Sequence, residues 1–243
     1  MYLSAHTLGY VLKSPLNYTN RTETTPKYGD HIDYIIFDNN GDMYTNDHND
    51  GLVRRFSSNS PNGTIVAGTG SSVSGTLKKP FGLAIDDNFT LYICDSNTKK
   101  IYKLEQNASA LVQVIDTSSY TKTPSAILLS MNSSDEIYVS DEGGTAVYLW
   151  KFNSATPTTT YTNVENGVKL SGPRGMKLDA DGNLYVADKN NLRIVMFCTS
   201  TNSTNGTIIA QVPSTPADLA FDSQMNLYTI GSGSGRVYKF ELY

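Results

Sequence analysis

The chain has 243 residues, a net charge of −4 and a charged fraction of 17 %. Its 19 basic residues do not outnumber its 23 acidic ones, so no overall positive charge indicates a nucleic-acid partner. No apolar run approaches the roughly 18 residues that a membrane-spanning helix needs. A high content of Tyr, Thr, Ser, Asn and Gly is typical of short strands joined by many turns. The composition therefore predicts a soluble all-β protein.

An internal repeat runs through the chain. A tyrosine that follows Met, Leu or Ile recurs six times at intervals of 42 to 48 residues, and Val or Ile stands nine residues after each one. The repeated tyrosines are Tyr2, Tyr44, Tyr92, Tyr138, Tyr185 and Tyr228. Asp or Asn stands six residues before each of the last five, at Asp38, Asp86, Asn132, Asp179 and Asp222. This period predicts a repeat architecture.

Each repeat is predicted to fold into four short strands. In the third repeat these cover residues 80–85, 91–94, 101–104 and 110–114, with turn residues between them. The proline that begins this repeat, Pro80, has counterparts at Pro124, Pro173 and Pro216. We therefore predict a single β-propeller domain over residues 1–243, with six four-stranded blades of which the first and last are incomplete. Five blades are the alternative, in which the N-terminal segment completes the last blade.

Two parts of the chain resemble the repeat of the NHL family. Residues 182–188 and 190–194, followed by Phe197, resemble a consensus NHL blade, and residues 80–86 resemble the start of one. The resemblance extends over nearly the whole chain and implies a propeller of NHL-type blades. It leaves the function open, because propellers of this family include ubiquitin-ligase substrate platforms, extracellular sensor domains, RNA binders and an amidating lyase.

The chain shows no motif for catalysis or for cofactor binding. The three histidines, His6, His31 and His48, are predicted to lie in exposed loops on one face, with His6 and His48 too far apart to share a metal ion. The run 179–183 indicates a hairpin turn rather than a calcium loop, because a strand follows it directly. Four aspartates, each three residues after a repeat tyrosine, are predicted to cap the following loops: Asp47, Asp95, Asp141 and Asp188. We expect no catalytic residue, no metal ligand and no cofactor.

The two cysteines lie in different repeats. Cys94 and Cys198 belong to repeats that are two apart, beyond the reach of a disulfide in a ring of blades. Both are predicted to be free thiols.

Asn-x-Ser/Thr sequons are more frequent than chance would give. There are eight of them, at Asn17, Asn20, Asn62, Asn88, Asn107, Asn132, Asn202 and Asn205. All are predicted in first-to-second or third-to-fourth strand turns, which a propeller places on one face. They indicate either N-glycosylation of that face or the use of Asn in hairpin turns.

The opposite face is the predicted binding surface. Its loops mix Lys and Arg with acidic residues, whereas the first-to-second strand turns carry acidic residues only. We expect a protein or small ligand to bind there through Phe81, Arg174, Lys177, His31 and His48. The predicted function is that of a non-enzymatic binding scaffold, a monomeric propeller within a larger polypeptide. The alternatives are a metal-dependent lyase or lactonase with a site in the central channel, and an RNA-binding propeller, although nucleic acid is not the expected partner.

The cellular location stays open. The first residues show neither the charged nor the apolar segment of a signal peptide. We expect an extracellular protein if a leader lies upstream of this sequence, and a cytoplasmic one otherwise.

Overall fold

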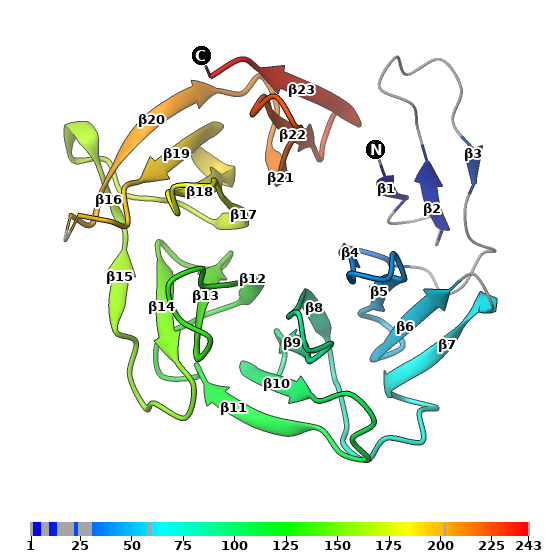
Figure 1. Cartoon of the computed structure of the whole chain (residues 1–243). Coiled ribbons are helices and arrows are strands. Elements are labelled where there is room, and N and C mark those ends of the chain that lie inside the picture. Colours follow the sequence, from blue (N-terminus) through cyan, green and yellow to red (C-terminus); the bar gives the residue numbers. More distant parts are fainter. Residues whose placement is uncertain are drawn as a thin grey trace. The chain divides into compact units, whose positions relative to one another are not determined.

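The structure, a computed structural model, describes residues 2–5, 10–13, 22–23, 31–57, 60–201 and 203–242. The described residues form an all-β protein with two short 3-10 helices (Figure 1). The chain divides into two compact units, residues 1–118 and 119–243. Each unit contains its own sheets, and the division falls in the connection between two repeats. Within the part described, no helix is long and apolar enough to cross a membrane.

The first unit holds three sheets of consecutive strands. A three-stranded sheet is followed by two four-stranded sheets, and neighbouring strands in each are antiparallel. The strands are β1 (Tyr2–Ala5), β2 (Tyr10–Lys13), β3 (Thr22–Glu23), β4 (Ile35–Phe37), β5 (Met43–Asp47), β6 (Leu52–Ser57), β7 (Ser60–Gly68), β8 (Pro80–Ile85), β9 (Leu91–Asp95), β10 (Lys100–Leu104) and β11 (Val112–Asp116).

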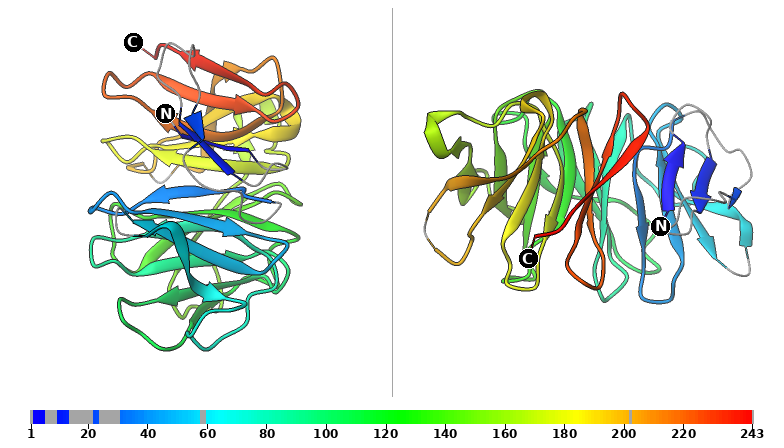
Figure 2. Two further views of the ribbon diagram at one scale, coloured as in Figure 1. Left: turned by 90° about the vertical axis from the view of Figure 1, so that its right-hand side faces the viewer. Right: turned by 90° about the horizontal axis from the view of Figure 1, so that it is seen from above.

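The second unit also holds three sheets, with four, five and three strands. Its five-stranded sheet gains β16, which pairs in parallel with β20. The elements are β12 (Pro124–Leu129), β13 (Glu136–Asp141), β14 (Val147–Lys151), β15 (Thr159–Tyr161), β16 (Asn163–Val164), η1 (Glu165–Gly167), β17 (Pro173–Leu178), β18 (Leu184–Asp188), η2 (Lys189–Asn191), β19 (Arg193–Phe197), β20 (Asn205–Gln211), β21 (Pro216–Phe221), β22 (Leu227–Gly231) and β23 (Arg236–Phe240). The side views in Figure 2 show these strands edge-on.

The prediction of a β-propeller is confirmed, but the prediction of six blades is wrong. From β4 onward the strands form five successive blades, namely β4–β7, β8–β11, β12–β15, β16–β20 and β21–β23. The repeat at Tyr2 does supply strands β1 and β2, but its third strand β3 has only two residues and its sheet has three strands in the part described. A tyrosine with Val nine residues later marks only a second and a third strand. In the part described, the sheet β1–β3 lacks a first strand, which all five blades contain.

The two ends of each blade differ in the connections they carry. Because successive strands are antiparallel, the first-to-second and third-to-fourth connections lie at one end, which we call the turn end. The second-to-third connection and the segment leading into the first strand lie at the other, which we call the loop end. A proline begins the first strand at the loop end in four blades, at Pro80, Pro124, Pro173 and Pro216. Each is followed by a shift in strand register, since proline donates no ladder hydrogen bond.

The repeated residues form the core of the blades. All five residues of β5, β9 and β18 are buried. The Val and Ile positions nine residues after the tyrosines are fully inaccessible at Val53, Ile101, Val147 and Ile194. These three second strands are covered on both faces, whereas the third strands β6, β10 and β14 bury only part of their residues.

The repeated aspartate and tyrosine form one turn-end motif. In the hairpin between β8 and β9, Asp86 Oδ1 accepts the N–H groups of Asn88 (3.0 Å) and Thr90 (2.8 Å), and Tyr92 donates its hydroxyl to Asp86 Oδ2 (3.4 Å). Tyr44 and Tyr228 contact Asp38 and Asp222 in the same way. Each carboxylate thus satisfies donors of its own hairpin.

The hairpin between β12 and β13 is two residues longer, because Leu129 pairs with Ile137 whereas Ile85 pairs with Leu91, and this changes the motif. Asn132, which the sequence aligns with the aspartates, does not take their place. Ser130 does, because its hydroxyl accepts the Asn132 N–H (3.2 Å) and its own N–H binds Glu136 O (3.0 Å).

The turn-end tyrosines predict a stability change at high pH. Burial raises the pKa of Tyr44 and of Tyr92 from 10.0 to about 12, and the nearby Asp38 and Asp86 add to the rise. Folding therefore favours the neutral phenol, so this stability is complete below pH 10 and is lost as pH rises towards 12. We expect alkaline unfolding in that window, measured by circular dichroism beside near-ultraviolet phenolate absorbance. In Tyr92→Phe the corresponding phenolate signal should disappear. Ionisation of every tyrosine near pH 10 in the folded protein would contradict this.

Candidate functional site

The loop end of the blades is built around buried aspartates. Asp95 is fully inaccessible, and its carboxylate accepts the N–H groups of Lys78 (2.7 Å), Lys79 (3.1 Å), Asn97 (3.1 Å) and Thr98 (3.1 Å). It thereby fixes both the loop after β9 and the segment before β8. The equivalent Asp47, Asp141 and Asp188 also accept backbone N–H groups of nearby loops. The contacts agree with the predicted capping role.

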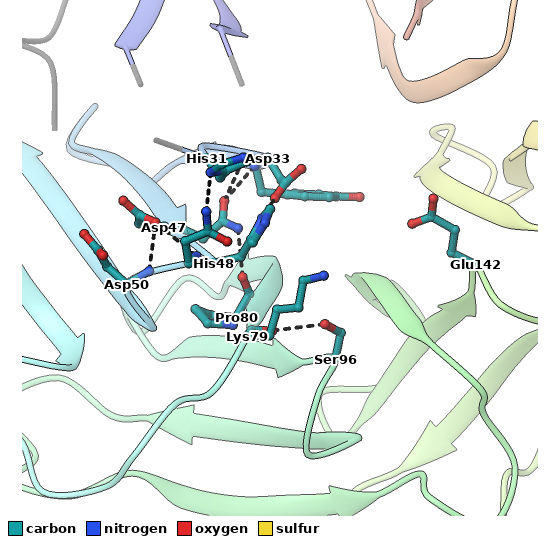
Figure 3. A network of polar contacts seen from close by, with 12 residues as sticks. His31, Asp33, Asp47, His48, Asp50, Lys79, Pro80, Ser96 and Glu142 are labelled. Carbon is teal, nitrogen blue, oxygen red and sulfur yellow. Dashed lines mark hydrogen bonds and ion pairs between the residues drawn. The ribbon is translucent and has the colours of Figure 1, made fainter. Parts of the chain in front are cut away.

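In the first unit two histidines meet at this end. The rings of His31 and His48 lie 4.9 Å apart between centroids. His48 Nδ1 contacts the carboxylate of Asp33, whose side chain is 2 % exposed, and Asn49 contacts His31 (Figure 3). His31 precedes β4 and His48 follows β5, so the antiparallel pairing of these strands brings the two residues to one place.

Two aromatic side chains, Phe81 and Tyr34, pack next to the histidines. Phe81 is 8 % exposed and stacks on His48, with centroids 6.2 Å apart and planes 20° apart. Tyr34 meets the Phe81 ring edge-on at 6.1 Å. Of the predicted binding residues, the structure therefore brings His31, His48 and Phe81 together. Phe81 is buried beneath the imidazoles, and His48 is half-buried rather than fully exposed as expected. His6 lies outside the described residues.

Two buried polar residues that the sequence reasoning missed tie neighbouring blades together. Asn46 is inaccessible; its Oδ1 accepts the Tyr34 N–H (2.7 Å) and its amide donates to Pro80 O (2.9 Å). In the second unit Ser140, also inaccessible, donates its hydroxyl to Arg174 O (2.7 Å). Both stand directly before a loop-capping aspartate. The position before the capping aspartate is apolar in other repeats, so a polar residue there was the sequence signal that could have indicated these two contacts.

In the second unit the two predicted binding cations, Arg174 and Lys177, lie at opposite ends of one strand. Arg174 lies near the start of β17, where Glu142 contacts both Arg174 (3.7 Å) and Lys189 (2.6 Å). Lys177 is exposed and lies near the turn end of the same strand, opposite Tyr185. Arg174 therefore belongs to the loop end of its blade, whereas Lys177 does not.

The described sequon asparagines lie at turn ends. Asn88 and Asn132 stand in first-to-second turns, Asn107 in a third-to-fourth turn, and Asn62 and Asn205 at the start of fourth strands β7 and β20. All five are exposed. Asn17, Asn20 and Asn202 lie outside the described residues. In each unit the described sequons thus leave the loop ends uncovered.

The two cysteines are free, as predicted, and differ in reactivity. Burial raises the pKa of the inaccessible Cys94 thiol, whereas hydrogen bonds from Ser200 and Thr201 lower the pKa of Cys198. Since the thiolate is the reactive form, we expect a disulfide reagent to label Cys198 in the native protein and Cys94 only after unfolding. The Cys198→Ser variant should therefore show no labelling before it unfolds. Labelling of both cysteines at one rate would contradict this.

Comparisons with known proteins find one repeat family and a shared fold. An NHL-repeat family model matches residues 170–197. This segment of the propeller is therefore an NHL repeat. A comparison with curated proteins finds no match.

Solved structures share the fold at low sequence identity. A chain in the crystal structure of a nidogen/laminin complex has a TM-score of 0.77 at 16 % identity, covering 98 % of this chain and 88 % of that one. A gluconolactonase from Xanthomonas campestris has a TM-score of 0.73 at 14 % identity, covering 95 % and 78 %. Virginiamycin B lyase from Staphylococcus aureus has a TM-score of 0.68 at 15 % identity, covering 99 % and 80 %. At such identities the likeness concerns the fold alone.

Proposed function

We propose that this chain is a binding module that recognises a partner protein through the loop end of its first unit. The contact surface consists of His31, His48, Asn49, Asp50, Lys78 and Asn97, which we call the loop-end surface. Its composition is polar and of mixed charge, which suits a polar protein surface carrying both signs of charge.

The observation that carries this proposal is the fixed position of the loop-end surface. Asp95 holds the backbone on both sides of Lys78 and Asn97, and Asp33 holds the imidazole of His48. Loop backbone and an imidazole held in this way lose little conformational entropy on binding, which favours affinity. The described sequons of the same unit, at Asn62, Asn88 and Asn107, lie at turn ends, so glycans on these three would leave this surface accessible.

Affinity measurements on surface variants test the proposal. The affinity of the wild-type chain for a purified partner protein is measured first. We expect His31→Ala and Lys78→Ala to weaken its binding about tenfold or more, as anchor residues do. Lys103→Ala, which changes a cation near the turn end of β10, is the matched control and should bind normally. Equal loss in the control, or no loss in the two variants, would refute the proposal.

A second candidate, an enzyme of the lyase or lactonase class, is favoured by the contact between Asp33 and His48. A carboxylate that orients an imidazole is one arrangement of a general base. Among the residues described, no group of three or more His, Cys, Asp or Glu side chains is arranged to hold a metal ion. Lactone turnover with added divalent cations, abolished by both Asp33→Asn and His48→Gln, would support this candidate. Turnover that survives either variant would count against it.

A further inference from the structure

A groove of about 280 Å³ opens between blades β4–β7 and β8–β11 of the first unit. Its lining combines the rings of Tyr44 and Phe89 with the apolar side chain of Val73. Polar groups from Arg55 and Glu105 complete it. The Arg55 guanidinium is already held, because it binds Asp42 (Nε–Oδ2 2.9 Å) and lies over the Tyr44 ring at 5.9 Å. The groove is therefore preformed, with aromatic and apolar walls beside fixed polar groups.

Asn107 is itself one of the residues that line the groove. Asn107 is exposed in the turn between β10 and β11, with φ of 63°, and Ser109 completes its sequon. Asn88, only one residue from Phe89, is equally exposed but is not among the residues that line this groove. A sugar attached to Asn107 therefore begins at the groove, whereas one attached to Asn88 begins outside it.

We propose that Asn107 is N-glycosylated and that the first N-acetylglucosamine packs into this groove. In the modification, the Asn107 amide nitrogen loses one proton and bonds to C1 of the sugar of a lipid-pyrophosphate-linked oligosaccharide, and the lipid pyrophosphate leaves. The apolar face of the sugar ring suits Phe89 and Tyr44, the acetamide methyl suits Val73, and the hydroxyls suit Arg55 and Glu105. Attachment makes this contact intramolecular, so even a weak affinity suffices for occupancy.

The first test compares thermal stability with and without the glycan. The protein is secreted from a glycosylating host, site occupancy is read by mass spectrometry, and the glycans are trimmed to one N-acetylglucosamine. We expect Ser109→Ala, which keeps Asn107 but removes its sugar, to lower Tm by about 2–4 °C, the shift that one favourable contact gives in a chain of this size. The same variant made without glycosylation should keep the wild-type Tm. Asn88→Gln is the matched control and should leave Tm unchanged in both forms.

The second test locates the sugar directly. We expect nuclear Overhauser effects between the protons of the sugar ring and the Phe89 ring, and their loss in Phe89→Gly. Glycine adopts the positive φ of 61° at this position without strain, so the variant should fold. In Phe89→Gly the Tm should no longer depend on Ser109. An unmodified Asn107 beside occupied sequons, an equal Tm loss in Asn88→Gln, or absence of the Overhauser effects would each overturn the proposal. None of these outcomes bears on binding at the loop-end surface.

Discussion

Replacing Asp95 with Ala should lower the free energy of unfolding by about 3–5 kcal/mol, because four backbone N–H donors lose a shared, buried acceptor at once. The carboxylate is inaccessible and accepts four backbone N–H groups from two segments. Asp95→Asn should cost less, since one side-chain oxygen remains an acceptor. Urea unfolding followed by circular dichroism measures both values.

Asp116→Ala is the matched control for Asp95→Ala. Asp116 is exposed in the same blade, and its carboxylate accepts the N–H of Ser118 (3.0 Å) within its own turn. Removing it should change stability by less than about 1 kcal/mol. If Asp95→Ala were as mild as this control, the carboxylate would not organise the loop end.

The buried ion pair of the second unit predicts the other large effect. Arg193 Nε lies 2.6 Å from Asp188 Oδ2, with side-chain exposures of 5 % and 0 %, and Arg193 also donates to Lys169 O (3.2 Å). Arg193→Ala leaves a buried, uncompensated carboxylate, so we expect a loss of about 3–5 kcal/mol in the free energy of unfolding. Arg193→Lys should lose less, because the charge remains while the forked donor geometry does not.

A double-mutant cycle separates the pair from its surroundings. Arg193→Ala and Asp188→Ala should be strongly non-additive, since the second change removes the charge that the first leaves unpaired. The exposed pair of Lys151 and Asp135, with side-chain exposures of 58 % and 46 %, is the comparison and should contribute less than about 1 kcal/mol. Additive losses at the buried pair would show that the two side chains stabilise the blade independently.

The fold was largely predictable because its signals are periodic and local. The tyrosines and the Val or Ile nine residues later fall on second and third strands, and these residues are buried in every full blade. The number of blades was not predictable in this way. Tyr2 and Val11 carry the same local signal as the later repeats, and β1 and β2 do pair. Completion of a blade depends on a first and a fourth strand, which carry no residue as regular as the tyrosine.

The candidate site was predictable only in part, because it depends on contacts between distant segments. Sequence position placed His31 and His48 on one face, but a separation of 17 residues gives no periodic sign that their rings meet. The burial of Phe81 follows from the packing of β8 against Tyr34 and His48, which its position beside a proline does not reveal. Asn46 and Ser140 were missed because their role is to reach a carbonyl of the next blade.

The contrast between turn-end and loop-end aspartates bears on how such a chain can vary in evolution. At the turn end each carboxylate serves its own hairpin, so an inserted residue disturbs one hairpin only. The β12–β13 hairpin has seven residues between its last paired positions, where the other four first-to-second hairpins have five, and it shows such an insertion accommodated by Ser130. At the loop end Asp95 joins two segments, so a length change in either one misaligns the other. An insertion at a turn end should therefore change one hairpin only, whereas a length change beside Asp95 must preserve its backbone contacts to both segments.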